Sequence, residues 1–319
     1  MRQLFTTLGI KIPIVQAPMG GAVPVRLAAA VSNAGALGTL PLWRADLETL
    51  RGTVRKMRGL TSKPFAVNLV TEFSQQERLE VCLEEGVPII SFFWRDPGAL
   101  VKRAKAGGAH VMYTVGNADD ARRAVDSGVD VIVAQGWEAG GHVRGTVATL
   151  PLVPAIVDAV GDTPVIAAGG IADGRGMAAA LALGAAGVWV GTRFLASEEV
   201  SIHPEYQRRI LAASENDTAY CENLFDGGWA NAPHRVLRNS TADVQPRPAS
   251  SMTLPRLTPS PSSAILPSAL SYGVNRSDRR LPLQSQRKGR SPAWFSKLPS
   301  PQQSMSARGT IGSCQCGYS

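Results

Sequence analysis

Cysteine is scarce in this chain of 319 residues, and the spacing of the few cysteines excludes two kinds of small-domain architecture. The sequence holds Cys82, Cys221, Cys314 and Cys316, with no CxxC pair and no spacing suited to zinc. A disulfide framework and a cysteine-rich zinc site are therefore excluded. This usage fits a reducing cytoplasm, and we expect Cys82 to be a buried structural thiol on a helix.

Long hydrophobic runs are also missing. No apolar run reaches the roughly 18–20 residues that a membrane-spanning helix needs. The first residues, MRQLFTTLGIKIP, lack the continuous apolar stretch of a secretory signal peptide. We therefore expect a cytoplasmic protein with no membrane partner.

Acidic residues nearly disappear from residue 241 onward. Residues 241–319 carry ten of the 33 Lys and Arg residues but only two of the 25 Asp and Glu residues. Residues 1–240 thus hold 23 of each and are formally neutral, so the net charge of +8 belongs to the C-terminal part. The high pI of about 9.6 is then no sign of a nucleic-acid partner, and we expect none.

The same C-terminal part differs in composition from the rest. Ser, Pro and Arg dominate it, and prolines recur too often for a long helix. We predict a domain over residues 1–240 and a disordered tail over residues 241–319. A basic interaction arm is the functional alternative for the tail. The abrupt change at residue 241 leads us to the hypothesis of a shifted reading frame.

Apolar strands alternate with amphipathic helices eight times between residues 12 and 190. Short connections between them predict a parallel sheet with right-handed crossovers. Eight repeats favour a closed (β/α)8 TIM barrel over a doubly wound sheet, because the first strand–helix turn also lacks a GxGxxG sequence. The predicted strands are residues 12–19, 36–40, 65–70, 87–94, 110–115, 129–134, 164–168 and 186–190.

The stretch VDVIVAQGWEAGGHVRG, residues 129–145, holds the strongest catalytic candidate. A buried strand ends at Gln135, and the glycine pair Gly140 and Gly141 then precedes His142. We expect this histidine to lie in a flexible loop at the barrel mouth, near Glu138. A neutral imidazole there can take a proton from carbon or stabilise a developing anion. A surface-loop histidine is the alternative, and no second ligand at helical spacing indicates a metal.

Glycines follow the seventh and eighth predicted strands, where TIM barrels bind phosphate. Gly169 and Gly170 come directly after one strand, and Gly191 with Thr192 after the other. Backbone amides of such loops and of helix N-termini bind a dianion. Simple tight turns are the alternative for either loop taken alone.

Two amides, Asn68 and Gln135, end predicted strands. An amide both donates and accepts, which suits the edge of a heterocycle such as flavin. Pro18 and Met19, after the first strand, are placed to press against a ring face. Ordinary solvated strand ends are the alternative for all four residues.

Five motifs taken in order are similar to the nitronate monooxygenase family, formerly called 2-nitropropane dioxygenases. They are IPIVQAPMGG, PFAVNL, AQGWEAGGHVRG, PVIAAGGIADGRG and VWVGTRFLASEE, and the match runs from Met1 to about residue 240. The resemblance implies a TIM barrel with non-covalent FMN, and it makes His142 the catalytic residue. The expected cofactor-binding residues are Pro18, Met19, Asn68, Gln135, Gly140, Gly141, Gly169, Gly170, Trp189, Val190, Gly191 and Thr192.

The resemblance implies flavin-dependent oxidation of alkyl nitronates or nitroalkanes with O2 to a carbonyl compound and nitrite. Flavin-type enoyl-(acyl-carrier-protein) reductases carry a similar EAGGH loop, so NAD(P)H-dependent enoyl reduction is one alternative, and an inactive flavin-binding barrel is another. The family pattern places a last barrel helix after residue 240. We find none there, and we therefore expect a barrel without it and an exposed apolar flank on strands one and eight.

Overall fold

The computed structural model describes residues 9–222, 229 and 231–239, all within one compact unit, Met1–Gln245. The predicted boundary at residue 240 and the predicted tail lie outside the described residues. Cys82 is fully buried in a helix, as predicted, and burial raises the pKa of its thiol to about 12.

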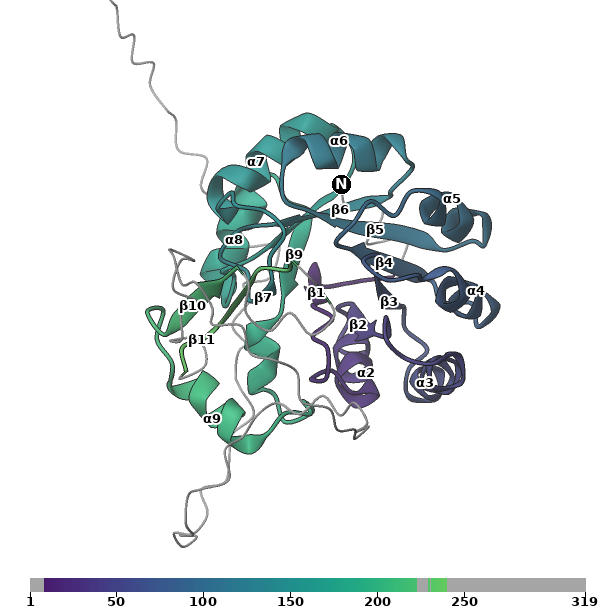
Figure 1. Ribbon diagram of the computed structural model, residues 1–319, viewed down its shortest axis with the longest axis horizontal. Coiled ribbons are helices and arrows are strands. Elements are labelled where there is room, and N and C mark those ends of the chain that lie inside the picture. The colour runs from purple at the N-terminus through teal and green to yellow at the C-terminus, as the bar shows by residue number, and fades with distance from the viewer. Residues whose placement is uncertain (1–8, 223–228, 230, 240–319) are drawn as a thin grey trace, which may run out of the picture. The chain divides into compact units, whose positions relative to one another are not determined.

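Eight parallel strands form the main sheet, with helices around it (Figure 1). All eight correspond to strands predicted from the sequence. Their order in the sheet is β1-β9-β8-β6-β5-β4-β3-β2. They are β1 (Ile14–Gln16), β2 (Gly38–Pro41), β3 (Phe65–Val70), β4 (Ile89–Phe93), β5 (His110–Val115), β6 (Val131–Gln135), β8 (Val165–Ala168) and β9 (Gly187–Val190).

The two outer strands of that order, β1 and β2, meet and close the barrel. Val15 pairs with Leu37 in a parallel bridge, and the Gln16 amide donates to the Leu37 carbonyl at 2.9 Å. The Gln16 side chain extends this pairing along β2, because it hydrogen-bonds both the amide and the carbonyl of Thr39. The predicted TIM barrel is therefore confirmed.

Helices follow the strands in alternation, and several begin where the sequence offers a capping side chain. Asp46 and Asn117 accept hydrogen bonds from the third residue beyond them and so cap α3 and α6. The helices are α2 (Val25–Asn33), α3 (Leu47–Leu60), α4 (Gln76–Glu84), α5 (Ala99–Ala106), α6 (Ala118–Asp126), α7 (Thr149–Val160), α8 (Gly174–Ala182), the 3-10 helix η1 (Thr192–Ala196) and α9 (Pro204–Ala212).

The barrel interior changes from apolar to polar toward the carboxyl ends of the strands. Val15, Leu37 and Ala66 belong to one buried apolar cluster, with Trp189 packed against it. Because strand side chains alternate, the residues two positions further along share the same interior face. That next layer consists of Thr39, Asn68, Ser91, Thr114 and Gln135, at the edge where TIM barrels place their sites.

A second, antiparallel sheet was not predicted. It joins β7 (Gly141–His142) to β11 (His234–Leu237), which pairs in turn with β10 (Thr218–Cys221). The prediction of a flexible glycine loop around His142 is therefore wrong. The ladder to β11 fixes the backbone there, although Gly141 supplies the left-handed turn with φ of +73°.

The prediction of an exposed apolar flank on β1 and β9 is also wrong. Ile14, Val188 and Val190 are almost completely buried. The segment that follows β9 is tied back to α2, because Arg26 donates to the Glu199 and Val200 carbonyls. Whether a last barrel helix follows residue 239 is a question outside the described residues.

No described helix is long and apolar enough to cross a membrane. Within the same described ranges, no group of three or more His, Cys, Asp or Glu side chains is arranged to hold a metal ion. His110 begins β5, and the His203 side chain caps α9 by accepting from the Glu205 amide.

Candidate active site

His142 lies at the carboxyl edge of the barrel, held from two sides. Across the small sheet it pairs with His234, and the Val143 amide donates to the Pro233 carbonyl at 2.9 Å. From β6, Gln135 Nε2 donates to the His142 carbonyl at 2.9 Å, and Gln135 Oε1 accepts from the Arg144 amide at 3.3 Å. Gln135 therefore fixes the histidine strand to the barrel, a role that the sequence did not reveal.

Aromatic rings surround the His142 imidazole. Its centroid lies 3.9 Å from the Trp229 ring, 5.8 Å from Trp94 and 5.1 Å from His234. Burial in these surroundings, with a smaller contribution from His234, lowers the pKa of His142 to about 4. The imidazole is therefore uncharged at neutral pH.

The rings beside His142 belong to a larger aromatic wall, made of Trp43, Phe73, Phe93, Trp94 and Trp229. Trp94 contacts Trp229 edge-on at 4.9 Å, and Trp43 stacks on Phe73 at 5.3 Å. Trp94 has φ of +95°, a strained value for a residue other than glycine, which is typical of functional sites. Because the wall combines segments near residues 43, 73, 93 and 229, no local pattern in the sequence revealed it.

His234 is the second imidazole of the site, and it is buried. Its Nδ1 lies 3.0 Å from the Ala232 carbonyl oxygen, which can only accept a hydrogen bond. Nδ1 therefore carries a proton when the ring is neutral. Sequence analysis assigned no role to this histidine, since its closeness to His142 depends on a ladder between distant segments.

Glu138 is not a partner of His142. Its carboxylate accepts from the Thr149 amide at 2.9 Å and from Thr149 Oγ1 at 3.0 Å, so it caps the start of α7. Thr149 Oγ1 in turn donates to the Gly169 carbonyl at 3.1 Å. A Cβ on Gly136 would lie 1.9 Å from that hydroxyl, so the loop after β6 tolerates only glycine there.

The predicted cofactor loops converge. A Cβ added to Gly140 would meet Thr192 Oγ1 at 3.0 Å, and one on Gly191 would lie 3.7 Å from Met19 Sδ. A Cβ added to Gly170, whose φ is +67°, would lie 3.6 Å from Glu138 Cβ. The loops after β1, β6, β8 and β9 therefore form one cluster, as the barrel prediction requires.

The backbone amides at the starts of α8 and η1 differ in whether they already have hydrogen-bond acceptors. The Asp173 carboxylate already accepts from the Arg175 and Gly176 amides at the start of α8. The first amides of η1, beginning at Thr192, have no acceptor within their own helix. A phosphate at the start of α8 would therefore compete with the Asp173 side chain, and the glycine loops after β8 and β9 stay the predicted phosphate site.

The polar layer fits the edge of a flavin. Thr39 Oγ1 is buried and has no hydrogen-bond partner among the described residues. Asn68, on the neighbouring strand, is 3% exposed and donates to the Ser91 carbonyl at 3.2 Å, which leaves its amide oxygen for another donor. A buried orphan hydroxyl beside an amide is what a heterocycle with N–H and C=O groups would satisfy.

The remaining predicted cofactor residues differ in what they can offer. Trp189 faces the barrel interior beside Val15, below the polar layer. The Val190 side chain points out of the barrel, because side chains alternate along a strand and Trp189 points in. The Val190 carbonyl accepts from the Ala17 amide. Pro18 lies on the loop after β1, which reaches the cluster, and Gly141 begins β7.

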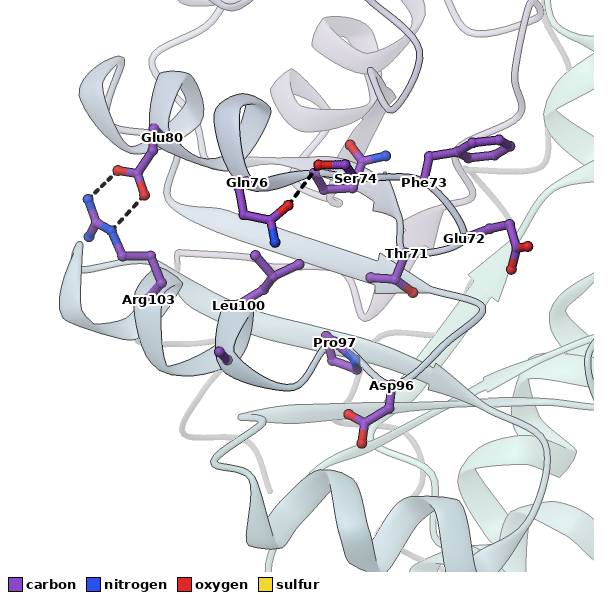
Figure 2. A pocket seen from close by; sticks show the side chains of 12 residues that line it. Thr71, Glu72, Phe73, Ser74, Gln76, Glu80, Asp96, Pro97, Leu100 and Arg103 are labelled. Atoms are coloured by element: carbon purple, nitrogen blue, oxygen red, sulfur yellow. Dashed lines mark hydrogen bonds and ion pairs between the residues drawn. The ribbon is translucent and has the colours of Figure 1, made fainter. Parts of the chain in front are cut away.

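A cavity of about 500 Å³ lies elsewhere, between α4 and α5 (Figure 2). Its acidic side chains already have partners, because Glu80 pairs with Arg103, Glu72 pairs with Arg95, and Asp96 caps the Gly98 amide. His142 does not line this cavity, and the cavity shares Phe73 alone with the aromatic wall, so we do not assign the reaction to it.

The comparisons with known proteins agree with this arrangement. The chain is 41% identical over 239 residues to (3aS,4S,5R,7aS)-5-hydroxy-7a-methyl-1-oxo-octahydro-1H-indene-4-carboxyl-CoA dehydrogenase of Mycobacterium tuberculosis, covering 74% of this chain and 66% of that protein, slightly less than two thirds. It is 35% identical to nitronate monooxygenase of Pseudomonas aeruginosa, covering 77% and 84%. The solved structure of FabK from Thermotoga maritima has a TM-score of 0.71 at 40% identity, covering 76% of each chain.

The model of the family described as nitronate monooxygenase matches residues 2–77 and 70–256. The matched residues span the described barrel, and the match agrees with its closed eight-stranded sheet. The chain belongs to the nitronate monooxygenase family.

Proposed function

We propose that this protein is an FMN-dependent oxidoreductase that oxidises alkyl nitronates, and neutral nitroalkanes, with O2 to a carbonyl compound and nitrite. The observation that carries the proposal is the uncharged His142 at the barrel mouth, beside loops that converge as a phosphate cradle. FMN, when bound, would supply the electron acceptor and pass electrons to O2. Family membership supports the flavin chemistry, while the choice of FMN and of nitronate is our proposal.

His142 has two roles in this proposal. With a neutral nitroalkane, its unprotonated ring nitrogen takes the proton from the α-carbon. With a nitronate, its ring N–H donates a hydrogen bond to the bound anion. Gln135 keeps the histidine backbone in place through the His142 carbonyl, and the aromatic wall excludes water from the proton transfer.

Asn68 and Thr39 would hold the edge of the flavin ring, and Met19 with Pro18 would lie against its face. The glycine loops ending at Gly170 and Thr192 would bind the phosphate through backbone amides. The described residues of the polar layer are all uncharged, which suits a flavin ring held by neutral hydrogen-bond donors and acceptors.

A second function is favoured by one observation. The aromatic wall beside His142 offers broad ring faces, which suit a bulky alicyclic skeleton better than a short alkyl chain. The relative at 41% identity is named for a CoA thioester with a fused bicyclic skeleton. Dehydrogenation of a bulky acyl-CoA is therefore the alternative to nitronate oxidation.

The decisive experiment starts from the purified full chain reconstituted with FMN. A flavin spectrum followed by nitrite release from propionate 3-nitronate in air supports the proposal. Flavin bleaching by a bicyclic acyl-CoA without nitrite favours the alternative. Anaerobic bleaching by NADH with turnover of an enoyl thioester favours enoyl reduction. No flavin uptake would leave an inactive barrel.

A further inference from the structure

The imidazoles of His142 and His234 lie on paired strands of the small antiparallel sheet. The proposed reaction uses His142 and assigns no step to His234. His142 and His234 are direct partners in the pairing of β7 with β11, and their ring centroids lie 5.1 Å apart. The His234 ring is buried and hydrogen-bonded to the Ala232 carbonyl at 3.0 Å. A buried polar ring bonded in this way cannot rotate freely, so it presents a fixed face to its partner.

We propose that His234 is a positioning residue for His142, which fixes the place of the catalytic ring against Trp229. This inference rests on the proposed function, because it assigns His142 the proton transfer. Trp229 also packs against the His142 ring, with a centroid distance of 3.9 Å, so both an indole and an imidazole contact the catalytic ring.

Electrostatics supports the same assignment. Like charges at this separation repel, and the His142 pKa falls mainly through burial and further through His234. The charged groups on the same ladder are already engaged, because Arg144 pairs with Asp120 and Arg235 lies over the Trp137 ring at 4.5 Å. Trp94 and Trp229, the other rings packed against His142, carry no charge.

His234→Phe keeps a ring in the ladder but removes the imidazole. We expect kcat/KM for a neutral nitroalkane to fall about 10²-fold, the loss typical of a misplaced catalytic group. We also expect the pKa of His142, followed by NMR of the ring nitrogens, to rise while it stays below its ordinary value, because burial is the larger cause of the shift. FMN affinity should stay unchanged. His203→Asn, which keeps a capping side chain at the exposed start of α9, is the matched control and should change none of these.

If the His234→Phe chain does not fold, His234→Gln replaces it, because the amide keeps a donor for the Ala232 carbonyl. A wild-type NMR titration gives a readout that needs no turnover. Unchanged kcat/KM and an unchanged His142 titration in a folded variant would overturn the inference. Absence of nitro turnover in the wild type would instead reject the proposed function, while the NMR result would still test the coupling of the two rings.

Discussion

The Gln16 side chain takes the place of a backbone partner at the seam of the barrel, the junction where β1 meets β2. There it hydrogen-bonds both the amide and the carbonyl of Thr39. The Thr39 amide donates to Gln16 Oε1 at 3.1 Å, and Gln16 Nε2 donates to the Thr39 carbonyl at 3.3 Å. Both residues are completely buried. The side chain of Gln16 therefore lengthens the hydrogen-bonded contact between β1 and β2 beyond their backbone pairs. This contact ends beside the Thr39 hydroxyl that has no partner in the described part of the chain.

Replacement of Gln16 by Leu should weaken this seam. Two buried backbone groups would lose their partners, and each unpaired group costs about 1–3 kcal/mol. We expect the free energy of unfolding in urea, followed by circular dichroism, to fall by about 2–6 kcal/mol. Gln207→Leu is the control, since that amide bonds the Leu195 and Ser197 carbonyls at a half-buried position where water can replace it. Equal losses in both variants would contradict the role of the seam.

Replacement of His142 by Ala should spare flavin binding and reduce turnover. A general base contributes about 10²–10⁴-fold, so we expect kcat for a neutral nitroalkane to drop at least 10²-fold. Turnover of a preformed nitronate should fall less, because no proton has to be removed. Stopped-flow flavin reduction measures both rates. Normal rates with both substrates would remove His142 from the mechanism.

The pH dependence should follow the lowered pKa of His142. The unprotonated ring is the active form, so kcat/KM for a neutral nitroalkane should stay level from pH 7 to about pH 5 and fall near pH 4. A fall in kcat/KM centred near pH 6.5 would show that burial does not lower the pKa of the His142 ring.

The same shift should appear in stability. The unfolded chain binds this proton more readily than the folded one, because the folded pKa lies below the ordinary value of 6.5. Stability from this group is complete above pH 6.5 and is lost as the pH falls toward 4, by up to about 3 kcal/mol. His142→Gln should remove this part of the pH dependence in urea unfolding at pH 7 and pH 4.5. Identical curves for the two chains would contradict it.

Replacement of Gly140 by Ala should weaken cofactor binding more than it weakens the fold. Its added methyl group would meet Thr192 Oγ1 at 3.0 Å, where a phosphate would approach the loop. We expect the dissociation constant for FMN, measured by fluorescence quenching, to rise about tenfold, equivalent to ~1.4 kcal/mol. Gly52→Ala, in α3 with open space around it, is the control and should leave the constant unchanged.

The barrel could be predicted because its signals are local. Each strand is a short apolar run, and each helix has its own apolar face and often its own cap, such as Asp46 or Asn117. The positions of the cofactor loops then follow from topology alone, since parallel strands end at one edge. The convergence of Met19, Gly140 and Gly191 needed no further information.

The surroundings of His142 could not be predicted in the same way. Strand β7 has two residues and begins with glycine, so it has no alternating pattern to detect. Strand β11 is short and half-buried, and its partner lies far away in the sequence. The contact of Trp229 with His142 depends on that pairing, and so does the shift in pKa. Long-range pairing between weak strands leaves no signal in a single sequence.

The ladder between β7 and β11 also constrains how this site can evolve. Residues 141–142 and 234–235 lie far apart in the sequence but share one set of hydrogen bonds. A mutation in either segment changes the environment of the other, so we expect strong epistasis between them and near-additive effects for pairs on separate barrel strands. Recombination that exchanges only one of these segments between homologues should therefore impair the catalytic histidine without altering it.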